Sequence, residues 1–315
     1  MVVLLAAGHL FAGGGRDRDD DRLRVGVSLG PQNNAWHVRL RQVVDAAVLN
    51  HPDIHWDVRN AANVADQQHM LETFMAMGFD AIVIMPTDGV LLAPIAAAIY
   101  HSGIPTVVFN RDIASPHRTA FVAGDNFGGG VNAARLIGER LGGEGDIVVL
   151  RSMTGTPIDM DRFTGFYSTL TRDFPNIRIL TQADGQFNRE AGLNAMTGIL
   201  PGFPRIDAVV TQDDEAALGA LTAIQNAGRT DIRYITGFGG TLPTFEIFQN
   251  QAANPAALNA RPLYLASMSY FPSMGFDAIE MAVRILRGIP FSRETILASQ
   301  VVGSWNVQEF MDDAY

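Results

Sequence analysis

The sequence predicts an α/β protein made of two similar lobes, each built on a parallel sheet. Two observations carry this prediction. Short β-branched runs alternate with longer segments of helical period, and two blocks of sequence recur about 125 positions further along the chain. With 315 residues and a hydrophobic fraction of 47%, the chain is large enough for two domains and two cores.

The strands are predicted from short runs rich in Val, Ile and Thr. These runs cover residues 25–29, 81–85, 106–109, 147–150, 208–211 and 234–236. Parallel strands need crossover connections, and four segments between or after the runs are predicted helices. They are residues 38–49, 65–77, 190–200 and 215–227. This alternation is typical of the α/β class.

The internal repeat indicates two lobes of the same design. The block HPDI at 51–54 matches FPNI at 174–177, and the block FDAIVI at 79–84 matches IDAVVT at 206–211. The offsets of 123 and 127 residues are nearly equal, and the surrounding order of strand, loop and helix is the same. Two doubly wound lobes follow from this pattern.

Two residue types are absent, and their absence excludes many mechanisms. All 23 cationic side chains are Arg, and the chain has no Cys. A Schiff-base lysine, a lysine-containing phosphate loop, a thiol nucleophile, a disulfide and a thiolate metal site are therefore excluded. A net charge of −10 without a basic run also argues against a nucleic-acid partner.

The first 23 residues are predicted to be a leader and linker. Residues 2–12 are almost wholly apolar and glycines follow at 13–15, as in a secretory signal, although no basic stretch precedes them. The run is too short to span a bilayer, and an unstructured apolar leader is the alternative. The charged stretch at 16–24 is expected to be a solvated linker. Because the sequence has no Cys, we expect an exported form to carry no lipid on cysteine.

Polar residues directly after the predicted strands mark the expected ligand site, because ligands of open parallel sheets bind outside the carboxyl ends of the strands. In the first lobe these residues are Gln32, Asn33, Asn34, Trp36, His37, Thr87, Asp88, Asn110, Arg111 and Asp112. In the second lobe they are residues 154–162, Gln212, Asp213, Asp214, Gly239 and Gly240. Two facing lobes would bring both groups to one cleft.

Six segments together carry a family resemblance. They are VGVSLGPQNNAWHVRL, PTVVFNRD, GTPIDMDRFTGF, DGQFNREAGLNAM, VVTQDDEAALGAL and ITGFGGT. From about residue 24 to 302 the chain resembles the periplasmic sugar-binding proteins of ribose type, which are the solute receptors of ABC importers. The resemblance implies the type I periplasmic binding protein fold, in which two Rossmann-like lobes joined by a three-crossing hinge close over a monosaccharide.

The resemblance also implies lobe boundaries, hinges and partners. The N-terminal lobe is expected to comprise residues 24–124 plus 271–298, and the C-terminal lobe residues 125–270 plus 299–315. Hinges fall near Gly124 and Asp125, near Tyr270 and near Ser299. The implied partners are a sugar or polyol and an ABC permease of the inner membrane, with a chemoreceptor as a further candidate. A periplasmic monomer without cofactor, metal or catalytic residue is expected.

Ten residues match the family's ligand-binding positions: Asn34, Trp36, His37, Asn110, Arg111, Arg162, Phe187, Asp213, Gly239 and Tyr270. A pyranose has apolar faces and a rim of hydroxyls, so it binds between aromatic rings with polar groups around its edge. The resemblance makes Trp36 and Phe187 the stacking rings. The planar forks of Arg111 and Arg162 can each donate to two adjacent hydroxyls.

Five departures from ribose receptors predict a different polyhydroxylated ligand. Those receptors usually have aspartate where Asn110 and Gly239 stand, asparagine where Asp213 stands, phenylalanine where His37 stands and glutamine where Tyr270 stands. Ribose would lose acceptors at two positions, and a buried donor without a partner costs about 1 to 3 kcal/mol. Gly239 is expected to open room. The more positive balance suits a sugar alcohol or tolerates a sugar acid.

Structural roles compete with ligand binding at several positions. Trp36 is alternatively a core residue or hydrophobic staple, and His37 a capping or solvated histidine. Arg162 is alternatively a surface residue paired with Asp159. The family match favours ligand contact for Trp36 and Arg162.

The acidic residues 213–215 are typical of a helix N-cap and its first turn, where carboxylates are stabilised by the helix dipole. We assign Asp213 to the ligand and Asp214 and Glu215 to the helix.

Several segments resemble enzyme motifs, but their residue spacing does not match the spacing that those motifs require. DMDRFT at 159–164 is similar to a phosphotransfer motif, but its threonine is one residue late and the required lysine is absent. The glycines at 128–130 lack dinucleotide-loop spacing and are expected to allow close backbone packing. His51 and His55 span a turn rather than one helical face, and no Gly-x-Ser-x-Gly elbow occurs. Catalysis is disfavoured.

A sugar-sensing regulator of the lactose-repressor type is an alternative because such regulators share this core. They carry an N-terminal helix-turn-helix domain, whereas only 23 residues precede the first predicted strand, and these are apolar, Gly-rich or charged. A solute receptor is therefore the preferred hypothesis, and a sugar-modifying enzyme is the least favoured.

Overall fold

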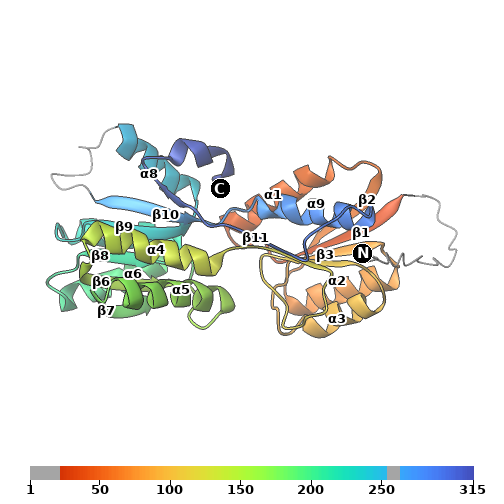
Figure 1. The fold of residues 1–315 in the computed structure, drawn as a ribbon, viewed down its shortest axis with the longest axis horizontal. Helices are drawn as coiled ribbons and strands as arrows, with labels where there is room; N and C mark the ends of the chain where they lie inside the picture. The colour runs from red at the N-terminus through yellow and green to blue at the C-terminus, as the bar shows by residue number, and fades with distance from the viewer. Residues whose placement is uncertain (1–21, 254–262) are drawn as a thin grey trace, which may run out of the picture.

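The computed structural model describes residues 22–253 and 263–315 and consists of two α/β lobes (Figure 1). Each lobe holds one six-stranded sheet. The predicted leader at 1–15 and most of the linker at 16–24 lie outside the described residues.

The sheet of the first lobe is parallel throughout. In spatial order it holds β11 (Glu294–Leu297), β5 (Ala120–Gly124), β4 (Thr106–Phe109), β3 (Ala81–Ile84), β1 (Leu23–Leu29) and β2 (Ile54–Asn60). Its helices are α1 (Ala35–Val48), α2 (Val64–Ala76), α3 (Ala93–His101) and α9 (Met274–Leu286). In Figure 1, α1 and α9 cover one face of this sheet, and α2 and α3 cover the other.

The sheet of the second lobe repeats the same order. It holds β12 (Val301–Gly303), β10 (Tyr264–Ser269), β9 (Tyr234–Gly239), β8 (Ala208–Thr211), β6 (Glu144–Arg151) and β7 (Asn176–Asp184). Its neighbours are parallel except that β12 runs antiparallel to β10. The helical elements are α4 (Asn126–Leu141), α5 (Pro157–Asp173), α6 (Arg189–Ile199), η1 (Leu200–Gly202), α7 (Asp214–Asn226), α8 (Leu242–Ala253) and η2 (Val307–Asp313). The matching strand orders confirm the predicted two-lobed α/β class.

The chain crosses between the two sheets three times. β5 leads into α4 after Gly124, β10 leads into α9 across residues 270–273, and β11 leads into β12 across residues 298–300. Figure 1 shows these crossings side by side at the junction of the lobes. The predicted three-crossing architecture is therefore confirmed.

Buried apolar side chains form one core cluster that is shared by both lobes. It contains Val27 of the first sheet, Val149 of the second sheet, and Phe238 and Tyr270. Each lobe has a further cluster of its own. The continuous cluster means that apolar packing extends through the junction.

Glycines bring α4 and α5 into backbone contact. A Cβ on Gly130 of α4 would lie 2.1 Å from the carbonyl oxygen of Arg162, and a Cβ on Gly165 of α5 would lie 2.1 Å from that of Phe127. A Cβ on Gly129 would meet the ring of Phe238 at 2.3 Å. The expectation that glycines at 128–130 allow close packing is confirmed. This packing sets the position of α5 along α4 and so places Arg162 beside Phe238 of β9.

We expect the substitution Gly130→Ala to destabilise the protein by about 1 to 3 kcal/mol, because the added methyl group overpacks a backbone contact. The matched control is Gly198→Ala in α6, where a Cβ has nothing within 4 Å. That control should stabilise by about 0.5 to 1 kcal/mol through helix propensity. Chemical denaturation measures both free energies of unfolding, and equal effects of the two variants would contradict the packing argument.

Candidate functional site

Five side chains meet where the carboxyl ends of the two sheets approach each other. We call them the inter-lobe cluster: Trp36, Asn110, Arg162, Phe238 and Tyr270. The first two come from α1 and the loop after β4, the next two from α5 and β9, and the last follows β10. Parallel strands end at the same edge of a sheet, which is why these distant segments converge.

Tyr270 connects the two lobes. Its hydroxyl donates to Asn110 Oδ1 at 2.8 Å, and its carbonyl oxygen accepts from Trp36 Nε1 at 3.0 Å. Its ring centroid lies 6.1 Å from those of both Trp36 and Phe238. A Cβ on Gly124 would lie 2.4 Å from the Tyr270 ring, so this crossing packs directly on another.

Arg162 is a buried cation, with 4% of its surface exposed. Its Nε donates to Asn126 Oδ1 at 2.9 Å and its Nη1 to the carbonyl oxygen of Gln212 at 2.6 Å. Its guanidinium carbon lies 3.7 Å from the centroid of the Phe238 ring and 5.0 Å from that of Tyr270. Burial lowers the pKa of this guanidinium.

The partners of Arg162 are neutral within the described residues. Asp159, its alternative partner from the sequence, instead binds Arg151 at 2.6 Å, so the surface ion-pair interpretation is wrong. Both side chains are buried, but each has other partners: Asp159 accepts from Arg151 and from the Gly155 N–H, whereas Arg162 donates to Asn126 and Gln212. A buried guanidinium with two neutral acceptors can still donate to a hydroxylated or anionic ligand.

The start of α1 holds three of the predicted residues. Asn34 is exposed and caps the helix, with its Oδ1 accepting from the His37 N–H at 2.9 Å. The His37 Nδ1 lies 2.8 Å from Asn33 Oδ1, and the ring packs edge-on against Trp36. Burial, and next the charge of Arg111, lower the pKa of His37 to about 4. His37 is therefore uncharged at neutral pH. Among the residues that the structure describes, Asn34 makes no hydrogen bond to the inter-lobe cluster.

The loop after β4 presents Asn110 and Arg111. Asn110 has φ of +64°, a left-handed conformation that Asn tolerates better than most residues. Arg111 donates from Nη1 to the carbonyl oxygen of Thr87 after β3. Burial lowers the pKa of Arg111, as it does for Arg162. The two predicted arginines thus lie on opposite lobes, and both are held by backbone acceptors.

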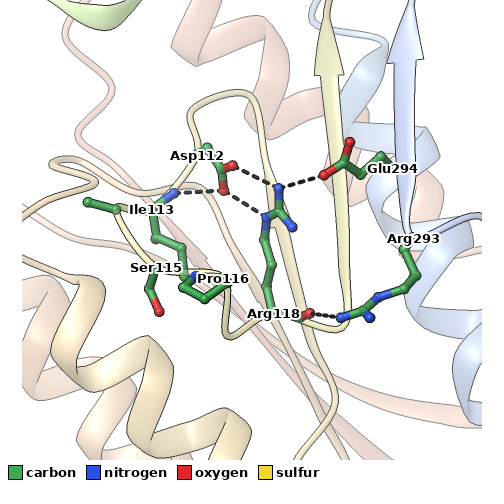
Figure 2. A pocket seen from close by; sticks show the side chains of 8 residues that line it. Asp112, Ile113, Ser115, Pro116, Arg118, Arg293 and Glu294 are labelled. Carbon is green, nitrogen blue, oxygen red and sulfur yellow. Dashed lines mark hydrogen bonds and ion pairs between the residues drawn. The ribbon is translucent and has the colours of Figure 1, made fainter.

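The same loop borders a surface hollow of about 570 Å³, shown in Figure 2. Arg118 crosses it and binds Asp112 at 2.8 Å and Glu294 at 3.1 Å. Arg293 donates to the Arg118 carbonyl oxygen. These ion pairs tie the loop to the start of β11, and the hollow is lined by two arginines and two carboxylates whose charges balance.

Asp213 and Asp214 have different partners at the start of α7. Asp213 caps the helix by accepting from the Ala216 N–H at 3.1 Å. Burial, and next the charge of Asp214, raise the pKa of Asp213 to about 7. Asp214 accepts from Ser267 Oγ at 2.6 Å and from two backbone N–H groups after β9. Its assignment to the helix alone is too narrow, because it joins α7 to β10 and to the loop before α8.

Phe187 and Gly239 are the remaining predicted site residues of the second lobe. Phe187 has φ of +50°, and its ring centroid lies 5.9 Å from the Arg162 guanidinium carbon. Gly239 has φ of +141°, and a Cβ there would lie 2.4 Å from the hydroxyl oxygen of Tyr315. The expectation that Gly239 opens room is wrong, because the Tyr315 side chain occupies that space.

Sequence reasoning missed Asn126, Phe238 and Tyr315 as neighbours of the site. Asn126 comes just after β5, so the rule of polar residues after strands could have found it. Phe238 lies inside a strand and Tyr315 follows no strand, so no local signal marks either. Within the described residues, three or more His, Asp or Glu side chains nowhere gather in a way that could hold a metal ion. None of the helices in that part of the chain is long and apolar enough to cross a membrane.

A family model described as periplasmic binding protein domain matches residues 25–290. The chain belongs to the periplasmic binding protein family. Its relatives are of the ribose type, as the sequence motifs predict. The ribose import binding protein of Bacillus subtilis is 31% identical over 218 residues, which cover 69% of each chain.

Two further proteins resemble this periplasmic binding protein. A xylitol-binding protein of Mycolicibacterium smegmatis is 29% identical over 223 residues, covering 70% of this chain and 63% of the relative's length. An ABC transporter solute-binding protein from Bacillus halodurans, solved with bound myo-inositol, has a TM-score of 0.81 and 22% identity. That match covers 94% of this chain and 99% of the other, and it confirms the fold.

The raised pKa of Asp213 predicts a pH-dependent stability of this periplasmic binding protein. A carboxyl whose pKa is about 7 when folded and 3.8 when unfolded stabilises the fold below pH 4 and loses this contribution as the pH rises through 7. Asp213→Asn keeps the helix cap and removes the titration. We expect the variant to gain stability relative to the wild type as the pH rises from 5 to 8.

Urea denaturation at a series of pH values measures this difference. The control is Asp53→Asn, because the hydrogen bond and charge of Arg287 lower the pKa of the exposed Asp53 and keep it ionised above pH 5. The effect of the control should stay constant between pH 5 and 8. Parallel profiles for the wild type and Asp213→Asn would show that Asp213 does not titrate in this range.

Proposed function

We propose that this protein is the solute receptor of an ABC importer and captures a monosaccharide or sugar alcohol between its lobes. The observation that carries the proposal is the environment of Arg162. This cation is buried against aromatic rings, has only neutral hydrogen-bond partners within the described residues, and lies at the junction of the two lobes. Aromatic surface beside fixed donors matches a ligand with apolar faces and many hydroxyls.

The proposed ligand is an extended polyol rather than ribose. Asn110 is engaged by Tyr270, and the carboxyl of Asp213 is partly protonated at neutral pH, so strong acceptors are few. Arg111 and Arg162 supply donors from opposite lobes. The relatives named for xylitol and for ribose support a sugar or sugar alcohol as the class of ligand.

The proposed mechanism is hinge closure between units formed by residues 24–124 plus 271–298 and 125–270 plus 299–315. The ligand binds one lobe in an open form and stabilises a closed form by its differential affinity. A membrane permease recognises the closed form, and the importer's ATPase supplies the energy of transport. Export to the periplasm and a binding role without catalysis belong to the same proposal.

Replacing Arg162 with alanine should weaken sugar or polyol binding at least tenfold, because the protein loses a buried hydrogen-bond donor to the ligand. The control is Arg189→Ala, which removes an arginine from an exposed ion pair with Glu215. Isothermal titration calorimetry gives the affinities, and circular dichroism verifies that both variants are folded. Unchanged affinity in a folded Arg162→Ala variant would remove this residue from the site.

A thermal-shift screen of sugars, sugar alcohols and sugar acids tests the ligand class. We expect a sugar alcohol to raise the melting temperature more than ribose does, since binding to the native state alone stabilises it. Stabilisation by ribose alone would contradict the proposed ligand, and no stabilisation by any compound would contradict the receptor function.

A further inference from the structure

Residues 307–315 pack against the second lobe near the carboxyl edge of its sheet. Phe310 of η2 stacks on Phe271, with ring centroids 6.0 Å apart. Leu242, the first residue of α8, donates its backbone N–H to the backbone oxygen of Tyr315 at 2.7 Å. These contacts anchor the segment to α8 and to the crossing segment after β10, and so fix the position of Tyr315.

The hydroxyl of Tyr315 lies where a side chain of residue 239 would begin. A Cβ built on Gly239 would be 2.4 Å from that hydroxyl oxygen, which is too close for any real side chain. Gly239 ends β9, and Asp213 follows the neighbouring strand β8 at the same edge of the sheet. Tyr315 therefore reaches the edge that carries the proposed binding residues, although it comes from a different part of the chain.

This hydroxyl is available for a further hydrogen bond. It makes none within the described residues, so its donor and acceptor sites both remain open. Asp214, whose Oδ2 lies 3.5 Å from the same Cβ position, is already used by Ser267 and the backbone after β9. Burial, and then the charges of Asp214 and Asp213, raise the pKa of Tyr315 well above its ordinary value, so the phenol stays protonated.

We propose that Tyr315 is a ligand-binding and specificity-determining residue. Its hydroxyl provides a polar group where Gly239 has no side chain, and it acts together with Arg162 and Asp213. The inference rests on the proposed function and deepens it by assigning to Tyr315 the preference for an uncharged polyol over a sugar acid. A phenol donates to one ligand hydroxyl and accepts from another. A ligand carboxylate at this place would instead lie beside two acidic side chains, so sugar acids are selected against.

The test uses the whole chain and a panel of xylitol, ribose, myo-inositol and gluconate in isothermal titration calorimetry. For the uncharged compound that binds best, Tyr315→Phe should weaken binding by about 3- to 10-fold, as expected for one lost hydrogen bond. The matched control is Tyr264→Phe, which removes a hydroxyl from an exposed tyrosine at the opposite end of β10 and should change nothing. Gluconate should bind more weakly than the best polyol.

Different failures have different meanings. A wild type that binds no compound contradicts the proposed function. A wild type that binds while Tyr315→Phe binds equally well contradicts only the role of Tyr315. Tighter binding by Tyr315→Ala would show that the side chain blocks the site rather than serving it, and preferred binding of gluconate would overturn the selection of uncharged ligands.

A ligand-free experiment tests the geometry separately. Gly239→Ala strains the backbone and clashes with the Tyr315 hydroxyl, so it should lower the urea midpoint more in the wild type than in a Tyr315→Ala background. The difference between the two backgrounds isolates the clash. Equal shifts in both backgrounds would show that Tyr315 does not occupy this position, and the inference would fall.

Discussion

The buried guanidinium of Arg162 is the constraint on which the junction of the two lobes depends. Removing an ion from water costs several kcal/mol unless hydrogen bonds replace the lost solvent. Two of those bonds come from Asn126 and Gln212, at the ends of different elements, and the Phe238 ring covers one face. Backbone contact of α4 with α5 at Gly130 sets the distance between these partners. The packing of α4 on α5, the position of Gln212 after β8 and the Phe238 ring therefore all stabilise the buried Arg162 side chain.

Tyr270 links the buried Arg162 to the first lobe. Its ring centroid lies 5.0 Å from the Arg162 guanidinium carbon, its hydroxyl donates to Asn110 and its carbonyl oxygen accepts from Trp36, so three segments from both lobes contact this one residue. This residue is also part of a crossing segment. A ligand that contacted the inter-lobe cluster would therefore act on the connection between the lobes directly, which is the physical link between binding and closure that the proposed receptor function requires.

Complete burial of an unbroken apolar run made some strands predictable, whereas the largely buried β10 was missed because Ser267 and Ser269 interrupt its apolar run. The β3 and β4 strands read as unbroken apolar runs because helices cover both faces, and all their residues are buried. Strands β2 and β7 were missed because each lies at an edge of its sheet and has only one buried residue, the others being half-buried or exposed. Their existence was nevertheless implied by the repeated blocks HPDI and FPNI, whose last residues fall in these strands.

The candidate site was predictable as far as it follows strand ends. Arg111, Gln212 and Asp213 were placed by that rule, because each closely follows a strand of a parallel sheet, Arg111 in the first sheet and the other two in the second. Gly239 marks the limit. In the sequence it is only a missing side chain, and the natural deduction is empty space; in three dimensions Tyr315 fills that space from a segment 76 positions away. A glycine in such a position can mean either that the space beside it is empty or that another side chain fills it. Only the three-dimensional structure distinguishes these two cases.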